Sequence, residues 1–114
     1  PLIPSQLTRV AKRASLGLAR TGTTGGHGSG DIFLAFSTAN AWDPCTQTDT
    51  TMPMEMLSEA QLNGVYRAAR DAVEESIINA MVAGETSDAF RPQGLQVKAM
   101  DHEALMALVR QYGA

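Results

Sequence analysis

The densest group of residues that could do chemistry lies between residues 21 and 36, in TGTTGGHGSGDIFLAF. His27, Ser29 and Asp31 alternate there with glycines, which allow another backbone or a substrate to approach closely. In an extended chain, residues two apart face the same way, so the three polar side chains could line one wall. A hydroxyl and a carboxylate on one wall are suited to proton transfer or to the support of a nucleophile.

Several known motifs fit this glycine-rich stretch poorly. A phosphate-binding loop would need a Walker lysine or GxGxxG in register, and it would lead into a helix. This loop leads into an apolar run that reads as a strand. The serine elbow GxSxG would need glycines where His27 and Asp31 stand.

Two further interpretations concern the three polar side chains themselves. A Ser-His-Asp triad needs bonds from serine to histidine and from histidine to carboxylate, which neighbours with Ser29 in the middle do not easily make. His27 is therefore expected to be a loop residue. Ser29 and Asp31 remain as a pair that supports a nucleophile from elsewhere. The alternative is a tight turn in which Asp31 only caps the strand.

The elements expected around this loop alternate between helices and strands. Ser5 is expected to cap a first helix that runs to about Leu16, with Gly17 and Gly22 ending it. Residues 31–37 are apolar on both faces, which is typical of a strand covered on both sides. Residues 40–56 are expected to form an irregular loop, with Trp42 in packing or at a pocket rim.

The second half of the chain is expected to contain two more helices. Ser58 and Gln61 form a capping box for the longest helix, which Gly84 ends. Residues 85–94 read as a loop and residues 95–100 as a short strand. Asp101 is expected to cap the last helix. Two strands are too few for a sheet that covers helices, so the chain is expected to be part of a larger fold.

Composition and charge exclude several classes of function. A net charge of −3 without a basic face argues against broad nucleic-acid binding, and no apolar stretch is long enough to cross a membrane. The single cysteine, Cys45, reads as a loop thiol, and no clustered ligand set predicts a metal. A cytoplasmic protein is expected, with a periplasmic location open. The amine of Pro1 could act as a base, but a helix follows at once where proline-based tautomerases need a strand.

The block RASLGLARTGTTGGHGSGDIFLAFSTAN, residues 13–40, resembles the small (beta) subunit of DmpA/BapA-type self-processing aminopeptidases. PLIPSQLTRVAKRA at the start, residues 71–85 and the final LMALVRQYGA are similar to the same subunit. The resemblance implies an α/β fold of the αββα-sandwich type, in which a precursor cuts itself into two subunits. It also implies that residues 1–114 are a single domain segment of the C-terminal (beta) subunit. The larger alpha subunit would supply the remaining strands of its sheets, and the two-subunit unit would assemble into a higher oligomer.

In that family the small subunit begins with a nucleophilic serine and a short strand, which would lie upstream of Pro1. The resemblance gives Ser29 and Asp31 the support of that nucleophile, although some relatives have the longer glutamate at the second position. It implies hydrolysis of an N-terminal L-, D- or β-amino acid from a short peptide, amide or ester, without metal or cofactor. The alternatives are a non-catalytic structural subunit and a self-cleaving acyltransferase of the ornithine acetyltransferase type.

Overall fold

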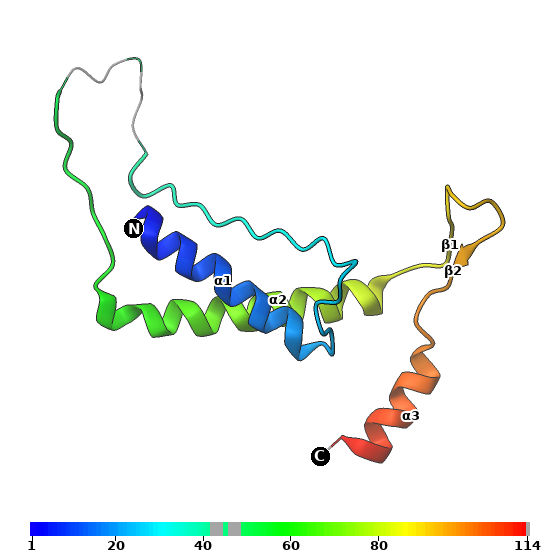
Figure 1. Ribbon diagram of the computed structural model, residues 1–114. Helices are drawn as coiled ribbons and strands as arrows, with labels where there is room; N and C mark the ends of the chain where they lie inside the picture. Colours follow the sequence, from blue (N-terminus) through cyan, green and yellow to red (C-terminus); the bar gives the residue numbers. More distant parts are fainter. Residues whose placement is uncertain (42–44, 46–48, 114) are drawn as a thin grey trace. The chain divides into compact units, whose positions relative to one another are not determined.

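The computed structural model describes residues 1–41, 45 and 49–113. These residues form the helices α1 (Pro4–Arg20), α2 (Leu62–Ala83) and α3 (His102–Tyr112), with a 3₁₀ turn at Glu59–Gln61. The strands β1 (Ser87–Asp88) and β2 (Gln96–Val97) complete the described elements (Figure 1). The chain divides into two compact units, Pro1–Glu74 and Glu75–Ala114, which are described separately.

Helix α1 is longer than the sequence suggested at both ends. Ile3 precedes its first residue, and Pro4 stands at the first helical position, where its missing N–H is not needed. Ser5 therefore lies inside the first turn, and the prediction that it caps the helix is wrong. Gln6, at the third helical position, reaches back to the Ile3 amide instead.

Gly17 does not end α1, contrary to the sequence-based expectation; it lies inside the helix, where α2 packs closely against it. A Cβ at this position would collide with the Arg70 carbonyl oxygen and lie 2.9 Å from the Cβ of Val73. Glycine is needed at this position because no larger side chain fits, and not because the helix ends there. It ends at Arg20, and Gly22 follows with a φ of 96°, which only glycine adopts readily.

Polar contacts also join α1 to the segment before and within α2. The guanidinium of Arg9 forms two hydrogen bonds with the Glu59 carboxylate, at 2.7 and 2.6 Å, and Arg20 pairs with Glu74. The Arg13 guanidinium lies over the Tyr66 ring, 4.4 Å from its centroid. Arg9, Arg13 and Arg20 therefore tie α1 to α2 or to the turn before it.

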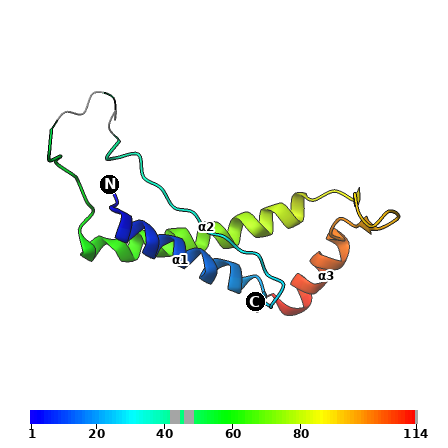
Figure 2. The ribbon, with the colours of Figure 1, turned by 45° about the horizontal axis from the view of Figure 1, so that its top comes forward.

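Residues 31–37 form an extended segment with no strand partner among the described residues. Ile32, Leu34 and Phe36 are 92%, 86% and 78% exposed in the chain by itself. The prediction of a strand covered on both sides is wrong for this chain alone, because a strand needs a neighbour to bond with its backbone. Figures 1 and 2 show the segment running back from the C-terminal end of α1 toward its N-terminal end.

Helix α2 begins differently from the prediction. Ser58 precedes the 3₁₀ turn and its side chain makes no capping hydrogen bond, so the predicted capping box with Gln61 does not form. The Gln61 amide bonds instead to the Ser58 carbonyl oxygen at 2.9 Å. The helix ends at Ala83, immediately before Gly84 as predicted.

The second unit contains a small hairpin and the last helix. β1 pairs antiparallel with β2, with Ser87 opposite Val97. β1 lies inside the stretch expected to be a loop, while β2 confirms a shorter form of the predicted strand. Asp101 caps α3 as predicted, accepting hydrogen bonds from the amides of Glu103 and Ala104, both at 3.0 Å.

Candidate active site

The hydroxyl of Ser29 donates a hydrogen bond to a carboxylate oxygen of Asp31. Both residues are exposed in this chain, at the start of the extended segment 31–37. The structure therefore brings together the two residues singled out from their spacing. With its proton directed at Asp31, the Ser29 oxygen keeps its lone pairs available to accept a hydrogen bond from another group.

The loop that presents this pair is shaped by its glycines. Gly25 has a φ of 59°, and its amide bonds to the Thr23 hydroxyl at 3.2 Å. The Ser29 amide then closes a turn on the Gly26 carbonyl oxygen at 2.8 Å. These local bonds direct the chain from the end of α1 into the extended segment and leave Ser29 at the surface.

Gly28 and Gly30 leave open space on both sides of Ser29. A Cβ at either position would meet no atom within 4 Å, and neither glycine has a positive φ. Conformation therefore does not require glycine at these positions. The close approach of a group from outside this chain is one physical reason for glycine at both positions.

His27 lies in the same loop without joining the pair. Among the described residues, no hydrogen bond connects it to Ser29 or to Asp31, and the serine hydroxyl bonds directly to the carboxylate. The arrangement is therefore not a Ser-His-Asp triad. His27 is a loop residue, as the sequence indicated.

The start of the chain and the loop 21–30, which holds Ser29 and leads into Asp31, lie at opposite ends of α1 (Figures 1 and 2). The helix has 17 residues, which corresponds to about 26 Å at about 1.5 Å per residue. Segment 31–37 runs in the reverse direction, and residues 33–35 line a shallow groove with Pro4, Leu7, Thr8 and Ala11.

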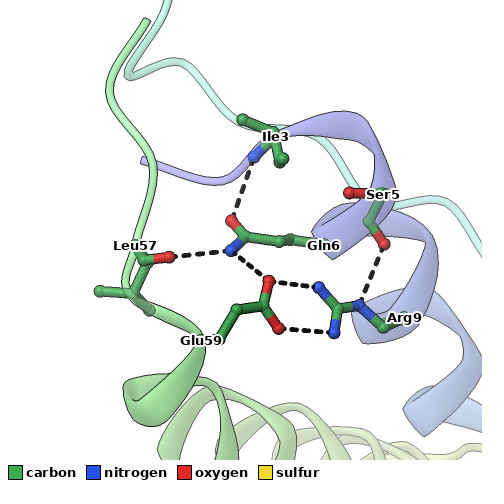
Figure 3. A network of polar contacts seen from close by, with 6 residues as sticks. All are labelled: Ile3, Ser5, Gln6, Arg9, Leu57 and Glu59. Carbon is green, nitrogen blue, oxygen red and sulfur yellow. Dashed lines mark hydrogen bonds and ion pairs between the residues drawn. The ribbon is translucent and has the colours of Figure 1, made fainter.

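A polar network that sequence reasoning missed surrounds the chain start (Figure 3). Gln6 is fully buried and bonds to Ile3, Leu57 and Glu59. Hydrogen bonds from Arg9 first, and from Gln6 second, lower the pKa of Glu59 to about 2. The only signal in the sequence was a glutamine at the third position of a helix, which is also the ordinary position of a capping residue.

The loop 40–56 has its own closing contact. The side-chain amide of Asn40 donates to the Glu55 carbonyl oxygen at 2.8 Å and accepts from the Glu55 amide at 2.9 Å. A cavity of about 430 Å³ lies beside this contact, lined among others by Asp49, Met52 and Met54. Trp42, considered for a pocket rim, lies outside the described residues.

Neither a metal site nor a membrane span emerges from the described part of the chain. No group of three or more histidine, cysteine, aspartate or glutamate side chains there could hold a metal ion. In the same residues, no helix is long and apolar enough to cross a bilayer. Cys45 is exposed.

A model of one protein family matches most of the chain. The family is described as Peptidase family S58, and the match covers residues 1–94. This agrees with the resemblance that the sequence motifs carry.

Two curated proteins are similar to the chain over nearly its whole length. Both are named beta-peptidyl aminopeptidase BapA. The one from Sphingosinicella microcystinivorans is 38% identical over 98% of this chain and 28% of its own length. The one from Sphingosinicella xenopeptidilytica is 32% identical over 96% of this chain and 27% of its own length. The chain therefore spans less than a third of these relatives.

Solved structures confirm the fold class. The L-aminopeptidase D-Ala-esterase/amidase from Ochrobactrum anthropi, described as a variant of the Ntn hydrolase fold, superimposes with a TM-score of 0.90. It is 49% identical over 99% of this chain and 31% of that protein. A beta-aminopeptidase from Burkholderia sp. gives a TM-score of 0.87 and 38% identity, over 100% of this chain and 33% of that protein. The predicted α/β class is confirmed, and the structural relatives have the Ntn hydrolase fold.

Proposed function

Because the chain belongs to peptidase family S58, we propose that it is the C-terminal (beta) part of a self-cleaving serine aminopeptidase of the N-terminal-nucleophile type. The proposed reaction is hydrolysis of the N-terminal residue of a short peptide, amide or ester. The observation that carries the proposal is the hydrogen bond from Ser29 to Asp31 at the open end of segment 31–37.

The nucleophile is proposed to be a serine upstream of Pro1, at the new chain start that self-cleavage creates. A strand of about eight residues rises about 26 Å at about 3.3 Å per residue, which matches the length of α1. Such a strand, ending at Pro1, would begin beside Ser29 and Asp31. It would run parallel to segment 31–37, with α1 as the crossover between two parallel strands.

The exposed apolar side chains of segment 31–37 support this arrangement. Ile32 and Leu34 lie two residues apart and therefore point to the same face of an extended chain, and both are almost fully exposed here. Burial of such side chains is worth about 1.5–3 kcal/mol each. Neighbouring strands and covering helices from the larger alpha subunit of the same precursor are the proposed partners.

In the proposed mechanism, the freed α-amine of the new N-terminal serine takes the proton from its own hydroxyl. An α-amine titrates near about 8, close enough to neutral pH for this role. The serine oxygen attacks the substrate carbonyl. The leaving nitrogen of the substrate takes the proton from the enzyme's α-ammonium and departs, and the N-terminal residue of the substrate remains as an ester on the serine. Water then attacks this ester and releases the amino acid.

Ser29 and Asp31 are proposed to support the α-amine and hydroxyl of the nucleophile. The Ser29 oxygen can accept a hydrogen bond from the α-ammonium while its own hydroxyl proton stays hydrogen-bonded to the Asp31 carboxylate. The Asp31 carboxylate stabilises the positive charge that develops on the amine during attack. Although aspartate is one methylene shorter than glutamate, Asp31 still reaches the Ser29 hydroxyl.

The relatives' names indicate the substrate class. Two are named beta-peptidyl aminopeptidases, and another is named an L-aminopeptidase and D-Ala-esterase/amidase. We therefore propose small peptides, amides or esters with a free N-terminal L-, D- or β-amino acid as substrates. A higher oligomer of the two-subunit unit is proposed as the assembly.

The test uses the full-length precursor. A denaturing gel should resolve two fragments, and N-terminal sequencing of the smaller should start with serine about eight residues before Pro1. The protein should hydrolyse the p-nitroanilide of at least one of L-alanine, D-alanine and β-alanine. An uncleaved precursor without activity on any of the three would favour a structural subunit, and acetyl transfer without hydrolysis would favour an acyltransferase.

A further inference from the structure

Gln6 is the only polar side chain that is buried among the described residues. Its Oε1 accepts a hydrogen bond from the Ile3 amide at 3.3 Å, and its Nε2 donates to the Leu57 carbonyl oxygen at 2.8 Å. The same nitrogen donates to a Glu59 carboxylate oxygen at 3.2 Å. Figure 3 shows this side chain between the first residues of the chain and the segment before α2.

The backbone joins the same two segments. The Leu57 amide donates to the Pro1 carbonyl oxygen at 2.8 Å, while the Leu57 carbonyl oxygen accepts from Gln6. Leu57 is thus bonded to the chain start through both its backbone groups. Arg9 holds the Glu59 carboxylate with two hydrogen bonds and so fixes the remaining partner of Gln6.

Helix formation does not require a side-chain amide at position 6. A buried polar side chain is unfavourable unless its donors and acceptors are paired, whereas a leucine could occupy the space without partners. The bonds of Gln6 differ from apolar packing because they specify the positions of two backbones. The two backbones, at Ile3 and at Leu57, lie beside the N-terminal end of α1.

We infer that Gln6 is a positioning residue, a latch that fixes Pro1–Ile3 against residues 57–59 and thereby sets where a nucleophile strand upstream of Pro1 lies. The inference rests on the proposed function. The latch holds one end of that strand, and the Ser29–Asp31 pair receives the other. Because a misplacement of about 1 Å in a reacting group can lower a rate about 10²-fold, release of the latch lowers the rate of chemistry.

The test compares Gln6→Leu with the wild type in the full-length precursor. We expect the rates of self-cleavage and kcat to fall about tenfold or more, while KM changes less than about twofold. A residue with a purely structural role would lower the amount of folded protein and leave kcat per folded molecule unchanged. Thermal unfolding and active-site titration are therefore measured on the same samples.

Gln6→Glu is the conservative variant, and it carries the test if Gln6→Leu does not fold. A carboxylate keeps the acceptor for Ile3 but loses the donor to Leu57 and repels Glu59. A protonated carboxyl regains the donor, and the Glu59 carboxylate, which Arg9 holds with two hydrogen bonds, can accept from it. The ratio of variant to wild-type kcat should therefore rise as the pH falls from 7 to 5.

Asp101→Ala is the matched control, since it removes two hydrogen bonds that lie within the first turn of α3. It should lower the unfolding temperature without lowering kcat. A kcat within twofold of the wild type for both Gln6 variants, at every pH, would overturn the latch while the proposed function stands. If the wild type itself neither cleaves nor hydrolyses, the proposed function fails, and the kinetic role of Gln6 fails with it.

Discussion

The Asp31 carboxylate accepts a hydrogen bond from the Ser29 hydroxyl, two residues earlier on the same exposed stretch of chain. The bond joins side chains on one face of an extended backbone and needs no tertiary packing. It orients the serine proton toward the acid and leaves the lone pairs of the serine oxygen available to accept a hydrogen bond. The first two predictions depend on this orientation.

Ser29→Ala removes the oxygen that is proposed to accept a hydrogen bond from the nucleophile. We expect kcat to fall by about 10²–10⁴-fold, the usual range for the loss of acid–base help, with slower self-cleavage of the precursor. Because Ser29 is exposed and its hydroxyl bonds to a neighbour two residues away, the unfolding temperature should change little. Steady-state kinetics and calorimetry of the full-length protein check both expectations.

Ser37→Ala is the control for that variant. Ser37 is a serine of the same extended stretch, and within the described residues its hydroxyl oxygen accepts only from the Ala39 amide, at 3.3 Å. It should leave kcat within about twofold of the wild type. Equal losses of kcat in the two variants would contradict a specific role for Ser29.

Asp31→Asn tests the charge of the acid separately from its hydrogen bond. The amide oxygen can still accept from Ser29, but it no longer offsets the positive charge on the α-ammonium. We expect kcat to fall by at least about tenfold, and Asp31→Glu, which keeps the charge, to retain more activity. Activity of Asp31→Asn equal to that of the wild type would show that the carboxylate charge is not needed.

Gly17→Ala tests the close approach of α1 and α2. A Cβ at position 17 would collide with the Arg70 carbonyl oxygen, so the helices must move apart. Overpacking of this kind destabilises a protein by about 1–3 kcal/mol. Urea denaturation of the full-length protein should show a lower midpoint.

Gly64→Ala should have the opposite effect in the same experiment. Gly64 lies within α2, and a Cβ there would meet no atom within 4 Å. Alanine is more favourable than glycine inside a helix by about 0.5–1 kcal/mol, so the midpoint should rise. A fall for Gly64→Ala would indicate that another part of the protein packs on this face.

Glu59→Gln tests the ion pair with Arg9 through its pH dependence. The pKa of Glu59 lies at about 2, below its ordinary value of 4.5, so the folded state favours the ionised form. Its contribution to stability is therefore present above about pH 4.5 and is lost as the pH falls toward 2. The variant should lack this part of the acid-induced decrease in unfolding temperature.

The difference between wild type and Glu59→Gln should also shrink in salt, because the Glu59 side chain is 57% exposed and ions screen exposed pairs. A difference in unfolding temperature that stays constant from pH 7 to pH 2.5 would contradict the ion pair as its source.

The sequence by itself determined the features that depend on neighbouring residues. The cap of α3 by Asp101 is local, and so is the bond from Ser29 to Asp31, because each joins residues within three positions. The apolar periodicity of α2 and its end at Gly84 are local in the same sense. The sequence motifs also carried the resemblance to a peptidase family, which the family match confirms.

Only the tertiary structure decided what Gly17, Gln6 and segment 31–37 do. Gly17 reads as a helix terminator until α2 is seen against it, and Gln6 reads as an ordinary polar residue until Leu57 and Glu59, more than 50 positions away, bond to it. Segment 31–37 has the composition of a buried strand, yet it is exposed in this chain, because burial and strand pairing require other segments. Contacts between residues far apart in sequence leave no periodic pattern, so these roles could be found only in three dimensions.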